Sequence, residues 1–328
     1  MPAIDCNVAN LSLSGPKSRC PLCNSPGKFS FQGRDLLYNK AETYRYTQCN
    51  HCRAVYQDPM PTPAEISGFY PDDYRVYRKI RRLKRHGYAE LAVLRHKYNY
   101  AHLNVPWLFR LLAPVLAGFM YRDNVRFVPN GKAIDIGCGN GKFIHMMNSL
   151  GWQSEGVEFS PLAVDVCREA GLKVFQGDVQ AAAFEENTFD LVSARHVIEH
   201  VPNPENFVRE IARILKKGGQ LLIQTPNSEA LGRQWFGTYW YANDVPRHLV
   251  LFCPANLRML TERHGLQLIT EKTVTTPKII LNSWDYMTGN NGKPSKKRKI
   301  RRVLVRPYVI LATVICRGDE VFAIYEKP

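Results

Sequence analysis

The chain has 328 residues, of which 45% are hydrophobic and 22% charged, a composition typical of a globular protein with a substantial core. No internal repeat or low-complexity tract is evident, which excludes solenoid and fibrous architectures. Residues 1–10 lack the charged start and the apolar core of a secretory signal. We therefore expect a cytoplasmic protein whose nine cysteines are metal ligands or reduced thiols rather than disulfides.

The formal net charge of +15 is unevenly distributed. Lys and Arg outnumber Asp and Glu by nineteen to nine in residues 1–130 and by eleven to four in residues 278–328. Residues 131–277 have fourteen basic against sixteen acidic side chains. An anionic partner is therefore expected to meet the flanks rather than the middle of the chain.

Two cysteine pairs with Cys-x-x-Cys spacing lie near the N-terminus and are separated by 25 residues. Two such pairs can supply four thiolates to one tetrahedral zinc ion, and the gap suits a small ribbon with hairpin strands. We expect a flexible N-terminus over residues 1–19 and a zinc-ribbon module over residues 20–74, with His51 outside the ligand set. The predicted zinc ligands are Cys20, Cys23, Cys49 and Cys52.

Residues 75–128 are predicted to form a basic, amphipathic helical connector, and residues 285–302 a basic insertion. Each basic cluster precedes an apolar stretch, at 105–121 and 303–316, but Arg110 and Arg306-Pro307 interrupt these stretches, so no transmembrane helix is predicted. Such segments suit the surface of an anionic membrane. An alternative interpretation of the same segments is a helical connector packed on the sheet together with a solvated charged loop.

A third interpretation is that the basic segments bind RNA, although few aromatic residues interleave with the basic ones. No DNA partner is predicted. The two clusters contain Arg75, Arg78, Lys79, Arg81, Arg82, Lys84 and Arg85, and Lys293, Lys296, Lys297, Arg298, Lys299, Arg301 and Arg302.

From Lys132 onward, apolar strand-like runs alternate with helical segments, which is typical of a parallel sheet covered on both faces. Residues 129–328 are therefore predicted to be one α/β domain. Ser160-Pro161 supplies a helix N-cap and a first-turn proline. The predicted strands are 132–135, 152–158, 173–176, 189–194, 220–225, 266–273 and 320–325, with helices near 141–150 and 205–216.

The first of these strands ends in a loop with the pattern Asp135-x-Gly-x-Gly-x-Gly141. Glycines let the backbone approach a ligand, and a carboxylate at the start of the loop suits a cationic amino-acid end better than a pyrophosphate. Glu158 lies 23 residues beyond Asp135, where a nucleotide-binding fold places an acid for the ribose hydroxyls. Asp178, after the third strand, is placed to accept a hydrogen bond from an adenine amino group. Together these features favour S-adenosylmethionine over NAD.

These motifs, with Phe189-Asp-Leu-Val192 and Leu215-Lys-Lys-Gly-Gly219, resemble those of class I S-adenosylmethionine-dependent methyltransferases over residues 130–275. The resemblance implies a doubly wound, mostly parallel seven-stranded sheet with its last strand antiparallel. It also implies that Asp135 and the glycines face the methionine part of the cofactor, Glu158 the ribose and Asp178 the adenine. The predicted cofactor-binding residues are Asp135, Gly137, Cys138, Gly139, Gly141, Glu158, Phe159, Asp178, Val179 and Arg195.

His196 and His248 are the candidate catalytic residues, because an oxygen or carbon nucleophile of high pKa needs a base and histidine titrates near neutral pH. His196 follows the fourth strand, and His248 lies in Pro246-Arg-His-Leu249, a segment that resembles one common in this methyltransferase group. His196-x-x-Glu-His200 also matches an inverted zinc-protease motif, but that motif needs a helix. Glu199 and His200 are interpreted as capping and packing residues. For His248, a purely structural role is an alternative of equal weight to a role in the substrate site.

An aromatic segment over residues 228–252 is predicted to be a lid, with a core role as the alternative. The cysteine module resembles the zinc-bearing front of bacterial methyltransferases linked to sugars, polysaccharides or secondary metabolites. We therefore expect a methyltransferase acting on an oxygen or carbon of a small-molecule, sugar, glycolipid or prenylated acceptor, near the inner membrane face. The alternatives are a zinc-bearing RNA methyltransferase and a catalytically silent S-adenosylmethionine-binding scaffold.

Overall fold

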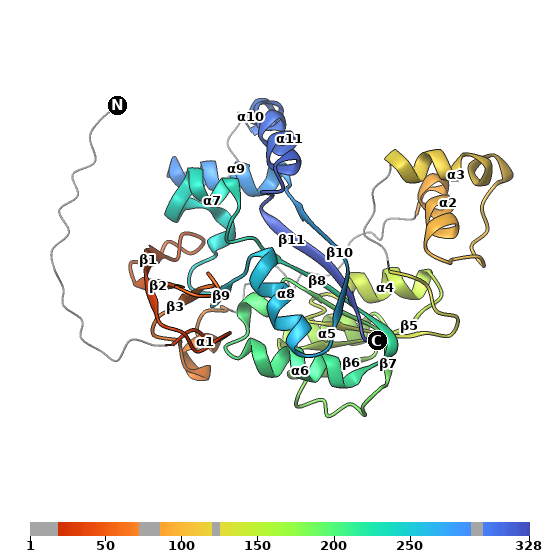
Figure 1. The fold of residues 1–328 in the computed structure, drawn as a ribbon, viewed down its shortest axis with the longest axis horizontal. Helices are drawn as coiled ribbons and strands as arrows, with labels where there is room; N and C mark the ends of the chain where they lie inside the picture. The colour runs from red at the N-terminus through yellow and green to blue at the C-terminus, as the bar shows by residue number, and fades with distance from the viewer. Residues whose placement is uncertain (1–18, 72–85, 120–124, 290–297) are drawn as a thin grey trace.

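A seven-stranded sheet lies at the centre of the fold, in a computed structural model that describes residues 19–71, 86–119, 125–289 and 298–328 (Figure 1). The strand order is β10-β11-β8-β7-β4-β5-β6, and β11 runs antiparallel to both of its neighbours. The predicted doubly wound, mostly parallel sheet with its last strand reversed is thus confirmed. The strands are β4 Lys132–Ile136, β5 Gln153–Glu158, β6 Val174–Gln176, β7 Phe189–Arg195, β8 Leu215–Pro226, β10 Gln267–Val274 and β11 Glu320–Glu326.

Helices cover both faces of the sheet because successive strand residues point to opposite sides. On β4, Ala133 packs into the core on the side of α4, whereas Ile134 packs into the core on the side of α6 and α8. Ser160 caps α5 by accepting a hydrogen bond from the backbone N–H of Ala163, as the sequence predicts. The flanking helices are α4 Lys142–Ser149, α5 Pro161–Glu169, α6 Pro204–Ile214 and α8 Pro254–Arg263.

One predicted boundary differs from the structure. The helix expected to reach residue 216 ends at Ile214, and β8 begins at the next residue instead of after Gly219. Leu215 pairs with Phe189, and the ladder then shifts register before Leu191 pairs with Gln220. Gly218 has a φ of +73° in this irregular stretch. The two glycines therefore form a bulge within the strand rather than a turn before it.

A second, four-stranded sheet joins the N-terminal cysteine module to a distant part of the chain. Its order is β1-β2-β3-β9, with antiparallel pairing throughout. The two residues of β9 pair with Val55 and Tyr56 of β3, so a segment predicted to belong to the aromatic lid completes the N-terminal sheet. The strands are β1 Gly27–Arg34, β2 Thr43–Cys49, β3 Val55–Gln57 and β9 Val250–Leu251, and the short helix α1 covers Pro63–Ser67.

A buried ion pair also links the cysteine module to the rest of the molecule. The Arg247 guanidinium lies 2.8 Å from Asp35 Oδ2 and 2.8 Å from Asp244 Oδ1. The Arg247 and Asp35 side chains are each 1% exposed. Because a buried charge is tolerated when it is paired and hydrogen-bonded, Arg247 and its two carboxylates must be placed together.

The predicted aromatic lid is partly core. Trp240 is 1% exposed, and its indole N–H donates to Asp319 Oδ1 over 2.8 Å. Trp235 and Tyr239 are 59% and 42% exposed, so only part of the segment is able to serve as a cover. Its elements are α7 Leu231–Phe236 and the 3₁₀ turns η3 Gly237–Tyr239 and η4 Tyr241–Asn243, and α9 Pro277–Met287 packs against them.

Two further pairs of helices flank the central sheet. The helix α2 Tyr88–Lys97 packs against α3 Trp107–Phe119 on the side of the molecule opposite the N-terminal module, and α10 Arg298–Leu304 precedes α11 Arg306–Val314 in the last part of the chain (Figure 1). None of the helices that the structure describes has the length and apolar composition needed to cross a bilayer. The predicted flexible terminus to residue 18, the basic residues 75–85 and residues 290–297 of the basic insertion lie outside the described residues.

The buried position of Arg247 predicts a large stability effect. In Arg247→Leu, Asp35 and Asp244 lose their cation, and we expect the free energy of unfolding to fall by about 3–5 kcal/mol. Arg126→Leu is the matched control, since Arg126 is 56% exposed and pairs with Glu326 at the surface; it should cost less than about 1 kcal/mol. Urea unfolding measures both. Asp35→Asn, which removes one charge and keeps the side-chain shape, should lie between them, and equal stability of all variants would contradict the assignment.

Candidate functional site

The glycine-rich loop leaves β4 in a conformation that side chains would block. Gly137 has a φ of +65°, and a Cβ atom there would lie 2.6 Å from Val197 Cγ2. Gly141 is also left-handed, with a φ of +76°, at the start of α4. Glu158 holds the loop in place: its carboxylate accepts hydrogen bonds from Gly139 N at 2.8 Å and from Ser160 N at 2.9 Å. The loop is thus preformed, and its glycines are required by the left-handed backbone and by the close approach of Val197.

Asp135 lies at the carboxyl end of β4 and is 4% exposed. Arg195, at the end of the neighbouring strand β7, places Nη2 3.7 Å from Asp135 Oδ2 and stacks over the Phe143 ring with its Cζ 4.0 Å from the centroid. Burial raises the pKa of Asp135 to about 6, although the charge of Arg195 opposes that shift. At neutral pH the group is mainly a buried carboxylate, which a cationic ligand group would stabilise.

The remaining predicted cofactor residues lie along the same edge of the sheet, at the ends of β4, β5 and β6. Cys138 and Val179 are buried, and Phe159 is 72% exposed beside Glu158. Asp178 is exposed, and its Oδ1 accepts a hydrogen bond from Ala181 N at 2.7 Å. The structure therefore gathers a glycine cradle, two buried acids, an outer acid and an exposed aromatic ring at one edge, which fits S-adenosylmethionine.

Comparisons with known proteins identify the family to which this chain is similar. Residues 121–271 match the model of a methyltransferase domain family. A ubiquinone biosynthesis O-methyltransferase from Burkholderia thailandensis is 30% identical over 168 residues, covering 45% of this chain and 69% of the relative. The enzyme of the same name from Xanthomonas axonopodis pv. citri is 33% identical over 159 residues, covering 44% and 66%. A solved S-adenosylmethionine-dependent methyltransferase from Mesorhizobium loti is 16% identical, with a TM-score of 0.44 over 66% of this chain and 97% of that one.

The seven-stranded sheet and the glycine-rich loop define an α/β domain with the methyltransferase fold. The chain belongs to the class I S-adenosylmethionine-dependent methyltransferases. It spans about two thirds of the length of the two curated relatives. The predicted enzyme class and methyl donor are thereby confirmed.

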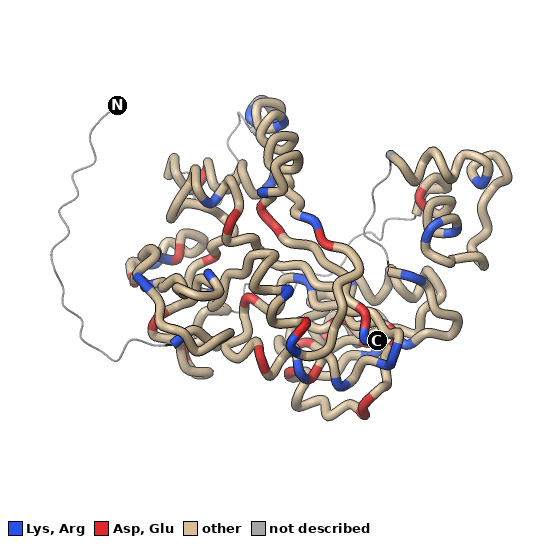
Figure 2. Tube along the Cα trace, viewed as in Figure 1, with Lys and Arg blue, Asp and Glu red and all other residues tan. Residues whose placement is uncertain are grey.

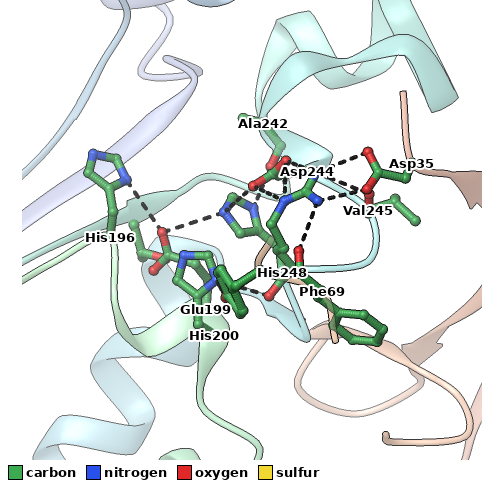
Figure 3. Close-up of polar contacts among 12 residues, drawn as sticks. Asp35, Phe69, His196, Glu199, His200, Ala242, Asp244, Val245 and His248 are labelled. Atoms are coloured by element: carbon green, nitrogen blue, oxygen red, sulfur yellow. Dashed lines mark hydrogen bonds and ion pairs between the residues drawn. The ribbon is translucent and has the colours of Figure 1, made fainter. Parts of the chain in front are cut away.

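A cluster of histidines and carboxylates follows β7 (Figure 3). His196 has a φ of +57°, which is unusual for a residue with a side chain and marks a constrained position. Its Nδ1 lies 3.3 Å from Glu199 Oε1, and its Nε2 lies 3.4 Å from Glu320 Oε1 on β11. Burial opposes the charged form of His196, but the hydrogen bond and charge of Glu199 and the charge of Glu320 outweigh it and raise its pKa.

Glu199 is the centre of this cluster. It lies on the 3₁₀ turn η2 Ile198–His200, is 0% exposed, and accepts a hydrogen bond from Thr225 Oγ1 at 2.9 Å. Burial alone would raise its pKa, but His196 and the other histidines hold it at about 2, so the side chain is a carboxylate at neutral pH. Its interpretation as a helix-start cap does not match this position. The zinc-protease alternative also does not match, because the motif lies on a strand end and a short turn.

His248 lies on the inner side of Glu199. Its Nδ1 is 2.9 Å from the Ala242 carbonyl oxygen, and its Nε2 is 4.0 Å from Glu199 Oε1 and 3.9 Å from Asp244 Oδ2. Burial and the neighbouring His200 lower the pKa of His248 to about 4, so it is neutral at pH 7. The structure thus brings both predicted catalytic histidines to one buried carboxylate.

The N-terminal module contributes to the same cluster. The Tyr70 hydroxyl lies 2.9 Å from His200 Nδ1, which also lies 2.9 Å from the Arg247 carbonyl oxygen. The Tyr46 hydroxyl donates to the His248 carbonyl oxygen over 2.8 Å. Neither tyrosine was predicted as a site residue. The sequence feature that could have pointed to Tyr70 is the Phe-Tyr pair at 69–70, which lies in the segment that resembles other zinc-bearing methyltransferases.

The four predicted zinc ligands converge at the outer end of the N-terminal sheet. Cys20 Sγ lies 3.5 Å from Cys52 Sγ, Cys23 Sγ lies 3.5 Å from Cys49 Sγ, and the four sulfur atoms lie within 4.8 Å of one another. The backbone N–H groups of Leu22 and Cys52 point to ligand sulfurs at 3.4 Å. These spacings suit four thiolates about 2.3 Å from one tetrahedral ion. His51 is exposed and outside the group.

The pKa of Asp135 predicts how cofactor affinity depends on pH. Because a cationic amino group binds the carboxylate form, S-adenosylmethionine affinity should fall as the pH drops below about 6, approaching tenfold per pH unit. Asp135→Asn should bind at least about tenfold more weakly and lose this pH dependence. Calorimetric titration at several pH values measures both effects. Asp165→Asn, at an exposed position on α5, is the control and should behave as the unchanged protein does.

Proposed function

We propose that this methyltransferase acts on a hydroxyl oxygen or an acidic carbon of a small-molecule, sugar, glycolipid or prenylated acceptor, with His196 as general base. The observation that carries the proposal is the position of the His196 imidazole between the carboxylates of Glu199 and Glu320. A hydroxyl or C–H nucleophile must lose a proton as the new bond forms. A histidine with paired carboxylates at the end of β7 is a means of removing that proton.

The roles of the residues follow from the contacts. S-adenosylmethionine, when bound, supplies an electrophilic methyl group on a sulfonium. Asp135 and the glycine loop hold its amino-acid end, and Glu158 is placed for the ribose. In this proposal the proton of neutral His196 is on Nδ1, which faces Glu199 Oε1 at 3.3 Å, so Nε2 takes the proton of the acceptor, and Glu320 at 3.4 Å then stabilises the imidazolium. Alignment of the acceptor with the methyl group supplies much of the remaining acceleration.

His248 is proposed as a positioning residue. Its lowered pKa makes it a weaker base than His196, and its side chain is buried whereas that of His196 is 45% exposed. His248 Nε2 faces the carboxylates of Glu199 and Asp244, at 4.0 and 3.9 Å, and so lies between protein groups rather than toward an acceptor. The names of the two curated relatives specify an O-methyltransferase of ubiquinone biosynthesis, which supports an oxygen nucleophile and a prenylated acceptor for this chain.

We also propose that Cys20, Cys23, Cys49 and Cys52 bind one structural zinc ion. The convergence of the four sulfur atoms and the N–H groups directed at them support this assignment. Zinc would fix the outer end of the sheet whose inner end holds Asp35 against Arg247. The ion is thus proposed to stabilise the wall of the site rather than to take part in the chemistry.

Labelled methyl transfer into fractionated extracts tests the acceptor class. Radioactivity in the lipid or glycan fraction supports the proposal. Label in RNA, with turnover stimulated by RNA and suppressed by salt, would instead favour an RNA methyltransferase. Binding of S-adenosylmethionine with no transfer to any fraction would favour a silent scaffold.

The His196 and Glu199 pair predicts a pH profile once an acceptor is known. Because His196 must be deprotonated and its pKa is raised, the rate should rise with pH along a limb that lies above pH 6.5. His196→Gln should lower kcat by about 10²–10⁴-fold. Glu199→Gln should shift the limb to lower pH, because the carboxylate that raises the pKa of His196 is gone. A merely structural role for Glu199 predicts an unshifted limb, and His96→Gln on the exposed side of α2 is the control.

The zinc assignment predicts a measurable metal content. The purified protein should contain one zinc per chain by elemental analysis, and Cys52→Ser should lose it and become sensitive to proteolysis between residues 19 and 71. Cys316→Ser changes an exposed cysteine far from the cluster and should keep the metal. Full zinc content in Cys52→Ser would contradict the assignment.

A further inference from the structure

We propose that the exposed apolar faces of α3 and of α10–α11 dock on an anionic lipid bilayer. Eleven large apolar side chains are exposed on these helices, which is far more than the scattered single residues expected on a protein surface. We call them the apolar docking faces. They consist of Trp107, Leu108, Leu111, Leu112 and Val115 on α3, and Val303, Leu304, Ile310, Leu311, Val314 and Ile315 on and next to α10–α11.

The α3 face has no partner among the described residues. On its inner side, Ala113 is 2% exposed and packs with Ala92 of α2. On its outer side, Trp107, Leu111 and Val115 recur every four residues and are 74%, 69% and 59% exposed. A helix with two apolar sides, one packed and one exposed, is suited to lie in a membrane interface.

The α11 face is built in the same way. Tyr308 and Ala312 pack into a core cluster with Leu231 of α7 and Ile280 of α9. Ile310 and Val314, half a turn away, are 64% and 73% exposed. The inner side of the helix thus holds it on the body of the protein while the outer side remains available.

The charges next to these faces select an anionic surface. Arg110 on α3, and Arg302 and Arg306 on α10–α11, are exposed beside the apolar residues. The sequence contains no Asp or Glu in residues 91–119 or 298–315. Apolar insertion beside basic side chains is the pattern expected for binding to anionic lipids. A second copy of this chain is disfavoured, because pairing two such faces would bring like charges together.

In the view of Figure 1, α10–α11 and α3 lie along the upper edge, and Figure 2 shows basic residues on both segments. The Trp235 ring on α7 lies 5.2 Å from the Tyr308 ring, so α11 borders the part of the aromatic segment that remains exposed. Docking would therefore bring the exposed aromatic cover to the lipid surface. A lipid-linked acceptor would then enter from the bilayer; this last step rests on the proposed function, whereas the docking itself does not.

Vesicle flotation tests the docking with the full-length protein and no acceptor. We expect binding to vesicles of about three parts phosphatidylglycerol to seven parts phosphatidylcholine, weakened by salt, and little binding to phosphatidylcholine alone. Leu111→Glu/Ile310→Glu should lower the partition coefficient at least about tenfold. The matched control is Phe29→Glu/Ile269→Glu, which adds the same charge at side chains 55% and 57% exposed outside the faces and should stay within about twofold.

The folding of each variant is checked by its affinity for S-adenosylmethionine and by its thermal unfolding midpoint. Unchanged flotation of the Leu111→Glu/Ile310→Glu variant overturns the proposal, as does an equal loss in the control. The proposal is also overturned if the unchanged protein does not bind vesicles and the Leu111→Glu/Ile310→Glu variant instead loses self-association or RNA binding. Because no acceptor is present, failure of docking leaves the proposed chemistry standing, and failure to find a lipid acceptor leaves docking standing.

Discussion

The buried guanidinium of Arg247 is the constraint on which the arrangement of the site depends. Its two carboxylate partners come from the N-terminal module, as Asp35, and from its own segment, as Asp244. Paired this way, the cation is tolerable in a place where an isolated charge would be costly. The same residue offers its backbone carbonyl to His200, and the next residue is His248. One buried charge thus positions two histidines and the module that lies over them.

The N-terminal module is therefore a wall of the site rather than an appendage. Tyr46 and Tyr70 reach the two histidine segments, and Asn256 of α8 donates to the Cys52 carbonyl oxygen on the cysteine side. The loop after β4 and the end of β5, where we propose that the methyl donor binds, make none of these contacts with the N-terminal module. The histidine cluster with its N-terminal module and the proposed donor-binding loop thus come from separate parts of the chain and meet at the end of β7.

Local signals made much of the fold predictable. The alternation of strands and helices, the glycine loop, the Ser160 cap and the acid at Glu158 are all encoded within a few residues of where they act. The missing parts are non-local. The sequence favours a cap at Glu199 because its distant partners, Thr225 and His248, become neighbours only when β8 and the segment around residue 248 pack against the end of β7. Likewise, nothing near Val250 indicates that β9 pairs with a strand nearly 200 residues earlier.

That pairing has a consequence for the order of events during synthesis. The ribosome releases β1, β2 and β3 early, yet the strand that covers the open edge of β3 follows roughly 200 residues later. At translation rates of about 5–20 residues per second, the edge of β3 waits on the order of 10–40 s for its partner. An uncovered strand edge is a site of mispairing between chains. The cysteine cluster, which closes entirely within the first part of the chain, is well placed to hold the young sheet together until its last strand arrives.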